Sequence, residues 1–419
     1  MNKASFLQQA SPHVTGNVYR SAALQQQQVA AAAPQQTQAQ QDATMLNNIW
    51  ARGIERLQPI ISQSFNPANQ TQVIFQPQNV GLVRGFLIQV TGTVTNTNTG
   101  SSGAALALTP FGASNILTNI VFTDTNNQVR HQTQGWHLGL INSAKQPMVM
   151  GGAYAPNVPV GYGNNWTVQS ATTAPAASAD GSISFYYYIP LSYGKYDLRG
   201  AMWAGITNAV AQLQLTINPN PVVASGDSTL AIYKGNTGGW KSGSTVTFNI
   251  WQDYIDQIPM VNTSQGPQPL VPTSLLQTLY CLNNTTLTGL TPAQDFGVPF
   301  GNWRQFLSTV IVYNNAGVLN VGSDINNFKL QTANTSQIWK TDPNTQALLA
   351  RSTFMADPPA GTYYFDSRLR PINTQQWGNV QIYVNPITVT NSTSALWVGW
   401  EYFTQANQVT NAQALPTGG

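Results

Sequence analysis

Residues 81–96, GLVRGFLIQVTGTVTN, form a run of β-branched and aromatic residues in which apolar and polar side chains partly alternate. This pattern is typical of a strand with one buried face. Similar runs, separated by Gly, Pro, Asn and Ser, recur along the same half of the chain: QTQVIFQ (70–76), NIVFTDT (119–125), GSISFYYYIPL (181–191), AQLQLTINP (211–219) and STVTFNIWQDYI (244–255). Short strands at this spacing predict an all-β sandwich or barrel rather than βαβ units.

A second set of strands follows a proline-rich break. Four prolines lie within residues 257–274, which makes Pro259 to Pro272 the best candidate for a linker. Strand patterns then resume as SLLQTLYCLN (274–283), RQFLSTVIVYN (304–314), GTYYFD (361–366), GNVQIYVNP (378–386) and ALWVGWEYF (395–403). Because 419 residues exceed what one core usually holds, we expect two β sandwiches in tandem.

One short helix is expected in each half. In the second half, Asp342 can cap a helix that has Pro343 at its first position and continues through residues 346–350. In the first half, GWHLGLINSAKQ (135–146) is the candidate.

The composition excludes several classes of function. Only 7% of the residues are charged, and the net charge is +3 without a Lys/Arg run, so sequence-specific nucleic acid binding is not expected. Cys281 is the single cysteine and is expected to be a buried apolar residue. The N-terminus lacks the apolar segment of a signal peptide and no apolar run approaches a membrane span, which predicts a soluble protein made in a cytoplasm.

The chain begins with a Gln/Ala-rich segment, with nine Gln and seven Ala in residues 21–41. After Pro34, apolar residues at three- and four-residue steps predict an amphipathic helix from Gln35 to Leu57, and Pro59 makes Gln58 its exit. We interpret this helix as an assembly arm whose residues are Met45, Leu46, Ile49, Trp50, Arg52, Ile54, Arg56 and Leu57. The apolar side chains form a stripe along this helix. The stripe either docks on a neighbouring subunit or another surface, such as anionic lipid, or packs on its own β core as a lid.

No pattern of ionisable residues indicates catalysis, a cofactor or a metal. His131 and His137 lack a nearby carboxylate or thiolate pattern and are expected to be ordinary hydrogen-bonded histidines. Asp253 and Asp256 could form a carboxylate pair, but at the end of a strand they are expected to face solvent or cap a turn. KGNTGGWKSGS (234–244) resembles a phosphate loop but has Trp240 where Gly should precede the lysine.

Seven segments in order resemble the major capsid protein of tectiviruses, the tailless icosahedral phages with an internal membrane. They are FNPANQTQVIFQPQNVGLVRGFLIQV (65–90), GWHLGLINSAKQ (135–146), YYYIPLSYGKYDLRGA (186–201), TANTSQIWKTDP (332–343), GTYYFDSRLRPI (361–372), QQWGNVQIYVNP (375–386) and GWEYFTQANQ (399–408). The resemblance covers about residues 64–409 and departs in the longer, more Gln/Ala-rich N-terminus.

The resemblance implies a double jelly roll: two tandem eight-stranded jelly rolls with short inserted helices and an N-terminal helical arm. We expect the arm at residues 1–63, the first roll at 64–258, a linker at 259–272, the second roll at 273–410 and a tail at 411–419. The implied function is a major capsid protein of a membrane-containing bacteriophage, assembled in the host bacterial cytoplasm, in which pseudo-hexagonal homotrimers tile the icosahedral shell of the virion.

The implied partners are other copies of the chain, neighbouring trimers, vertex and minor capsid proteins, and the internal membrane through the arm. Loop tryptophans, Trp166, Trp203 and Trp240, either lie between subunits or plug their own sandwich. The rival interpretation is a glycan-binding or adhesive β-sandwich protein, because Trp and Tyr among Asn and Gln also form lectin-like surfaces. An enzyme is not expected.

Overall fold

The structure is a computed structural model, and it describes residues 37–98, 105–145, 172–205, 210–228, 230–263, 266–319, 323–332, 337–354 and 357–405. It consists mainly of strands. Those of the first half are β1 (Ile54–Phe65), β2 (Gln72–Phe75), β3 (Leu82–Asn96), β4 (Ala107–Leu108), β5 (Leu117–Thr123), β6 (Val129–Thr133), β7 (Asp180–Pro190), β8 (Met202–Trp203), β9 (Gln212–Ile217), β10 (Val222–Val223), β11 (Tyr233–Lys234), β12 (Gly238–Trp240) and β13 (Val246–Asp256).

The strands of the second half are β14 (Met260–Thr263), β15 (Gly266–Pro269), β16 (Thr278–Leu287), β17 (Phe296–Pro299), β18 (Gln305–Asn315), β19 (Val318–Leu319), β20 (Ile325–Thr332), β21 (Gln337–Thr341), β22 (Thr362–Asp366), β23 (Ile372–Asn373), β24 (Val380–Pro386) and β25 (Ala395–Gln405). The helices of the described residues are α3 (Gln38–Arg52), the short 3-10 helix η1 (Gly112–Ile116), α4 (Gly135–Lys145), α5 (Thr273–Gln277), α6 (Pro343–Phe354) and α7 (Thr374–Trp377).

The first half is an antiparallel sandwich. One sheet has the order β1-β13-β3-β7 and the other β2-β9-β5-β6. If these eight strands are numbered along the chain, the orders are 1-8-3-6 and 2-7-4-5, which is the jelly-roll arrangement. Alternate residues point into a shared core, where the rings of Phe86 on β3 and Phe122 on β5 lie 5.6 Å apart.

The second half repeats the same arrangement. Its sheets have the orders β16-β25-β18-β22 and β17-β24-β20-β21, again 1-8-3-6 and 2-7-4-5. Its core contains Phe328 on β20, whose ring lies 4.7 Å from that of Tyr363 on β22. The tandem double jelly roll expected from the sequence is therefore the observed fold.

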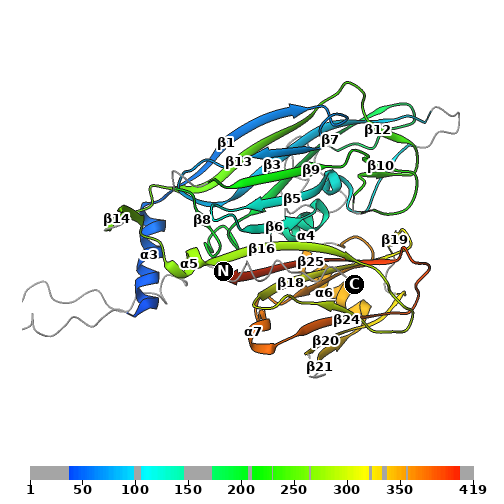
Figure 1. The fold of residues 1–419 in the computed structure, drawn as a ribbon. Coiled ribbons are helices and arrows are strands. Elements are labelled where there is room, and N and C mark those ends of the chain that lie inside the picture. Colours follow the sequence, from blue (N-terminus) through cyan, green and yellow to red (C-terminus); the bar gives the residue numbers. More distant parts are fainter. Residues whose placement is uncertain are drawn as a thin grey trace, which may run out of the picture.

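The two rolls share one continuous sheet. The fifth strand of the first roll, β6, pairs in parallel with the first strand of the second roll, β16, through the registers Leu282–His131 and Asn283–Gln132. Successive strands of a jelly roll alternate in direction, so the first and fifth strands of a roll run the same way. The parallel pairing therefore shows that both rolls point in the same direction, side by side (Figure 1).

Both predicted inner helices are confirmed, and they occupy equivalent places between the fifth and sixth strands of each roll. The helix α4 lies between the two rolls, and all of its residues from Gly135 to Ala144 are buried (Figure 1). The helix α6 begins at Pro343, and the Asp342 carboxylate accepts hydrogen bonds from the backbone N–H groups of Asn344 and Thr345.

The predicted N-terminal helix is wrong in extent. It ends at Arg52, and Ile54, Arg56 and Leu57 lie on β1, which pairs with β13 in the first roll. Gly53 ends the helix in an extended conformation, and a Cβ there would lie 2.4 Å from Ile255 Cγ2, so only glycine fits this turn. Pro59 sits at a register shift in an edge strand, where proline is tolerated, and therefore does not end a helix.

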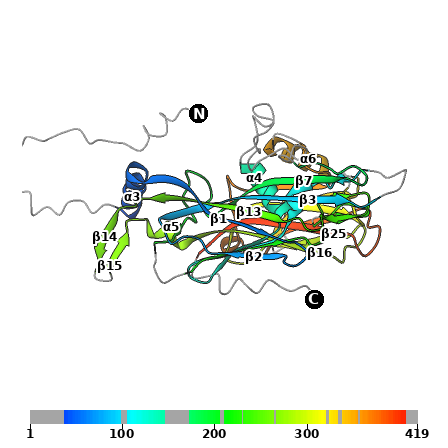
Figure 2. The same ribbon diagram turned by 90° about the horizontal axis from the view of Figure 1, so that it is seen from above.

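The helix α3, the helix α5 and the β14–β15 hairpin gather at one end of the elongated molecule (Figure 2). The hairpin lies within residues 259–272, the segment expected to link the rolls. Ile49 of α3 is fully buried in a small cluster with residues from the ends of β13 and β3 and from α5.

The contact between α4 and β25 gives the first prediction. A Cβ at Gly399 would lie 2.2 Å from His137 Cδ2, so Gly399→Ala should destabilise the protein by about 1–3 kcal/mol in urea unfolding. Combining it with His137→Ala makes room, so the double variant should be less destabilised than the sum of the two single variants.

The matched control is Gly239→Ala on β12, where an added Cβ has no atom within 4 Å. It should leave the free energy of unfolding nearly unchanged. Strict additivity of the Gly399 and His137 substitutions would show that the added methyl group does not clash with the His137 ring.

Candidate functional site

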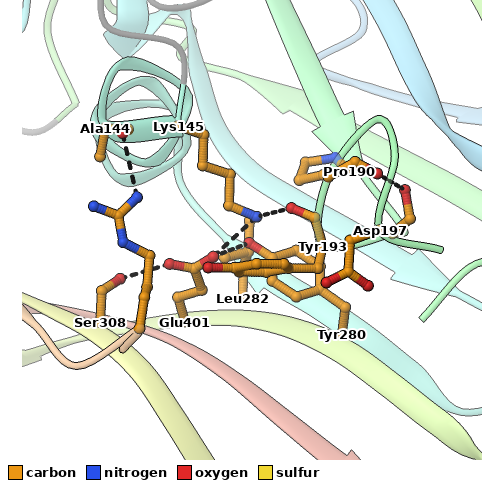
Figure 3. Close-up of polar contacts among 12 residues, drawn as sticks. Ala144, Lys145, Pro190, Tyr193, Asp197, Tyr280, Leu282, Ser308 and Glu401 are labelled. Atoms are coloured by element: carbon orange, nitrogen blue, oxygen red, sulfur yellow. Dashed lines mark hydrogen bonds and ion pairs between the residues drawn. The ribbon is translucent and has the colours of Figure 1, made fainter. Parts of the chain in front are cut away.

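The buried junction between the rolls is the most strongly built polar site among the described residues, and Figure 3 shows its centre. Lys145, the last residue of α4, reaches from the first roll toward Glu401 on β25 of the second, with 2.9 Å between Nζ and Oε1. Lys145 also donates to the backbone carbonyl of Tyr193 at 2.6 Å. The Lys145 ammonium lies 4.1 Å from the ring centre of Tyr280.

Every oxygen of the Glu401 carboxylate has a partner. The Tyr280 hydroxyl donates to Oε1 at 2.8 Å, and the Ser308 hydroxyl donates to Oε2 at 2.7 Å. The side chain of Glu401 is fully buried, and burial alone would raise its pKa. The Lys145 ammonium and these hydrogen bonds outweigh that effect and lower the pKa below the usual range, so the carboxylate is charged.

The Lys145–Glu401 pair fixes the orientation of the two rolls more than it adds to the free energy of unfolding. A buried ion pair roughly cancels its own desolvation cost, whereas one partner left alone in the interior is strongly unfavourable. A different angle between the rolls would separate Lys145 from Glu401 and leave both charges buried. The pair therefore selects one mutual orientation of the two rolls.

Sequence reasoning missed this pair. The feature of the sequence that indicated it is the single acidic residue in the apolar run ALWVGWEYF (395–403). A charge in a buried strand requires a buried partner. The partner lies on a helix of the other roll, 256 positions earlier in the chain, and nothing local in the sequence connects the two.

The two histidines belong to the same junction and are hydrogen-bonded, as expected. The Leu282 N–H of β16 donates to His131 Nδ1 at 3.1 Å, so Nε2 carries the proton and donates to the Pro190 carbonyl at 2.7 Å. His137 Nδ1 lies 2.7 Å from the Thr133 hydroxyl. Burial lowers the pKa of each ring to about 3, so both are neutral. No group of three or more potential metal ligands occurs among the described residues.

The two aspartates of β13 serve separate ion pairs. Asp253 accepts from Arg84 at 2.5 Å and from the Tyr188 hydroxyl at 2.7 Å, and its side chain is only 15% exposed, so the expectation that it faces solvent is wrong. Asp256 pairs with Arg56 at 2.9 Å. Both carboxylates are therefore occupied by structural contacts.

The residues of the predicted assembly arm divide into two groups. Leu46, Ile49 and Trp50 pack on their own subunit in the cluster at the end of the first roll, and Met45 is half-buried. Arg52 is exposed in the last turn of α3. On β1, Ile54, Arg56 and Leu57 are exposed, so the structure does not bring the eight residues into one stripe.

The loop tryptophans that the structure describes pack within their own subunit. Trp203 lies against the cluster that holds α3, and Trp240 lies against the core of the first roll with its indole N–H donating to the Asn218 carbonyl at 2.8 Å. Trp240 belongs to the segment that resembled a phosphate loop, and here it is a packing residue. Trp166 lies outside the described residues.

The neutral histidines predict a specific dependence on pH. The unfolded chain binds protons near pH 6.5, whereas the folded state binds them only near pH 3, so the unfolded state holds more protons in between. The contribution of these histidines to the free energy of unfolding is fully present above about pH 6.5. It falls as the pH decreases, by about 1.4 kcal/mol per pH unit for each histidine. Carboxylates with a lowered pKa, such as Glu401, reduce the free energy of unfolding further only below about pH 4.5, where they begin to be protonated in the unfolded chain.

The measurement is the free energy of unfolding in urea between pH 6 and 5 at a fixed protein concentration. His137→Asn retains a polar atom near the position of Nδ1 and should reduce the slope by about one histidine's share, about 1.4 kcal/mol per pH unit. An unchanged slope would show that the pKa of His137 is the same in the folded and unfolded states.

Comparison with known proteins agrees with this architecture. The family model described as P3 major capsid protein N-terminal matches residues 13–258, and the model described as P3 major capsid protein C-terminal matches residues 277–417. The chain is 37% identical over 392 residues to Major capsid protein P3 of Enterobacteria phage PRD1, covering 91% of this chain and 97% of that protein.

Solved structures show the same fold at much lower identity. A chain in the atomic structure of Sulfolobus Turreted Icosahedral Virus matches with a TM-score of 0.58 and 11% identity, over 86% of this chain and 96% of that one. A chain of the PBCV-1 virus capsid matches with a TM-score of 0.53 and 12% identity, over 84% and 94% respectively. The two family models and the extent of the PRD1 match show that this chain belongs to the P3 major capsid protein family, a family of structural bacteriophage coat proteins rather than enzymes.

Proposed function

We propose that three copies of this chain form a pseudo-hexagonal trimer, and that such trimers tile the icosahedral shell of a membrane-containing bacteriophage. The observation that carries the proposal is the parallel β6–β16 pairing, because it sets two similar rolls side by side and pointing the same way. Three such molecules around one axis present six similar sides. Hexagonal units of this kind pack closely into a continuous layer.

The domain division belongs to this proposal. The first roll begins with β1 at Ile54, and residues 259–272 with α5 lead into the second roll at β16. The helix α3 begins at the end of the molecule that also carries the β14–β15 hairpin (Figure 2), and we take the residues that precede it in the sequence as the arm proper. We assign that end to the inside of the shell, where the arm contacts the internal membrane or neighbouring trimers. Vertex and minor capsid proteins are the remaining partners.

Among the described residues no helix is both long and apolar enough to cross a bilayer. Arg56 is exposed but already paired with Asp256, and Arg52 is exposed in the last turn of α3. The proposed contact with the membrane therefore rests on the residues before α3 rather than on β1.

The oligomeric state tests this proposal directly. Light scattering coupled to gel filtration should give three times the chain mass of 45.3 kDa, and negative-stain images should show hexagonal outlines. Monomers or separate lobes would contradict the coat-protein trimer and favour the glycan-binding or adhesive alternative.

Removal of residues 1–44 should leave a folded trimer that associates poorly into shells. The truncation keeps Leu46, Ile49 and Trp50, which hold the rest of α3 on its own subunit. Light scattering of assembly mixtures measures the loss of shell formation. A second truncation that removes only residues 1–36 separates the effect of those residues from that of α3. A monomeric truncated product would show instead that the arm holds the trimer together.

The melting temperature of the trimer should change little between low and high salt. Few charges are available to any interface in a chain with 7% charged residues, and apolar and neutral contacts are not screened by ions. Differential scanning calorimetry measures this. A large decrease on adding salt would mean that ion pairs dominate the contacts between subunits.

A further inference from the structure

The two rolls touch at a second place, at the end of the molecule opposite α3. There the loop between β10 and β11 of the first roll meets the turn between β18 and β19 of the second roll (Figure 1). The backbone N–H of Asp227 in the loop donates to the Gly317 carbonyl of the turn at 2.6 Å. This contact is separate from the junction that holds Lys145 and Glu401.

The side chain of Asp227 binds a group from each roll. Its Oδ2 accepts a hydrogen bond from the backbone N–H of Leu319 in the second roll at 3.1 Å. Its Oδ1 accepts from the ammonium of Lys234 in its own roll at 2.5 Å. The side chain is only 11% exposed. Hydrogen bonds to a charged group are roughly twice as strong as those between neutral groups, so this carboxylate ties the loop firmly to the turn.

Two glycines allow the two backbones to come this close. Gly226 and Gly317 have φ angles of +82° and +88°, which residues with a side chain rarely adopt. A Cβ at Gly226 would also lie 3.1 Å from the Gly317 carbonyl oxygen. Asn314 stabilises the turn, because its Oδ1 accepts from the N–H of Gly317 at 2.6 Å. The residues on both sides of the contact therefore suit it.

We propose that Asp227 is a positioning residue that clasps the outer ends of the two rolls, so that they do not swing apart about the β6–β16 junction. We name its contacts with Gly317 and Leu319 the outer clasp, because the opposite end of the molecule is the one assigned to the inside of the shell. All of these contacts lie within one chain. The proposal therefore holds whether or not three copies form the proposed trimer.

The distance between the outer clasp and the junction gives the clasp a large effect on the angle between the rolls. Ser308 on β18 donates to Glu401, the partner of Lys145 at the junction. Asn314 lies six positions further along β18. At about 3.3 Å per residue, this separation is about 20 Å. A small rotation about the junction therefore moves the outer ends much further than the junction itself.

Hydrogen exchange followed by mass spectrometry tests the outer clasp in the full chain. Asp227→Ala removes the acceptor of the Leu319 N–H, so exchange in a peptide of the second roll covering residues 314–319 should become about tenfold faster. Exchange in β20 and β24 of the same roll should not change. Unchanged exchange at residues 314–319 would overturn the proposal. An equal increase throughout the second roll would overturn it as well, because it would report a general loss of stability.

Three further variants separate the contact between rolls from the charge of the first roll. Lys234→Met removes the partner within the first roll but keeps the bond to Leu319, so exchange in the peptide should stay slow. Asp227→Asn keeps an oxygen that can accept, and should restore most of the protection. Asp180→Ala, the matched control, breaks the exposed pair with Lys241 and should leave the second roll unchanged. An increase with Lys234→Met or Asp180→Ala as large as that with Asp227→Ala would overturn the proposal.

Distances between spin labels measure the swing itself. Ser242→Cys lies in the exposed turn between β12 and β13 at the outer end of the first roll, and Ile387→Cys follows β24 in the second. Cys281 is buried and burial raises its pKa to about 12, so it stays unlabelled. Co-expression with an excess of unlabelled chain leaves one labelled copy in each assembly. Asp227→Ala should widen the distribution of distances between the two labels.

The control pair of labels lies near the inner end. Tyr196→Cys and Leu369→Cys occupy exposed loops that follow β7 and β22, and the Tyr196 ring lies 6.0 Å from that of Trp50 on α3. Their distance distribution should widen much less on Asp227→Ala. Equal widening at both ends, or an unchanged distribution at the outer end, would show that Asp227 does not set the angle between the rolls.

Discussion

The parallel pairing of β6 with β16 is the constraint on which the rest of the structure depends. It converts two separate sandwiches into one body with a continuous sheet and sets both rolls in the same direction. Around it, the neutral His131 ring connects β6 to β16 and to the end of β7, and the Lys145–Glu401 pair joins α4 to β25. Strand pairing gives the direction of the rolls, and the buried polar contacts give their angle.

A chain with so few charges places several of them inside. Glu401, Arg130 and Asp124 are buried with partners, and Arg130 donates to Asp124 at 2.9 Å. Buried ions specify orientation because any other arrangement leaves them unpaired. Other charges are paired at the surface, where both side chains of Lys241–Asp180 and of Arg351–Asp357 are exposed.

Much of the fold could be predicted from the sequence, and the failures have physical causes. Runs such as residues 81–96 alternate with a period of two because one face is buried, so the strands and the tandem sandwiches were predictable. Asp342 and Pro343 marked the start of α6 correctly. At Gly53 the spacing of apolar residues fits both a helix and an edge strand, and the close packing of Gly53 and the pairing of β1 with β13 decide between them. The junction between the rolls could not be predicted because the residues that meet there, such as Lys145 and Glu401, are distant in the sequence.

The central claim is that the β6–β16 pairing and the buried contacts around it fix the two rolls in one mutual orientation. The most direct measurement is an experimental density map of the purified protein. Both rolls should point in the same direction, with β6 beside β16 and the Lys145 ammonium within hydrogen-bond distance of the Glu401 carboxylate. Rolls that point in opposite directions, or that meet through other strands, would contradict the account.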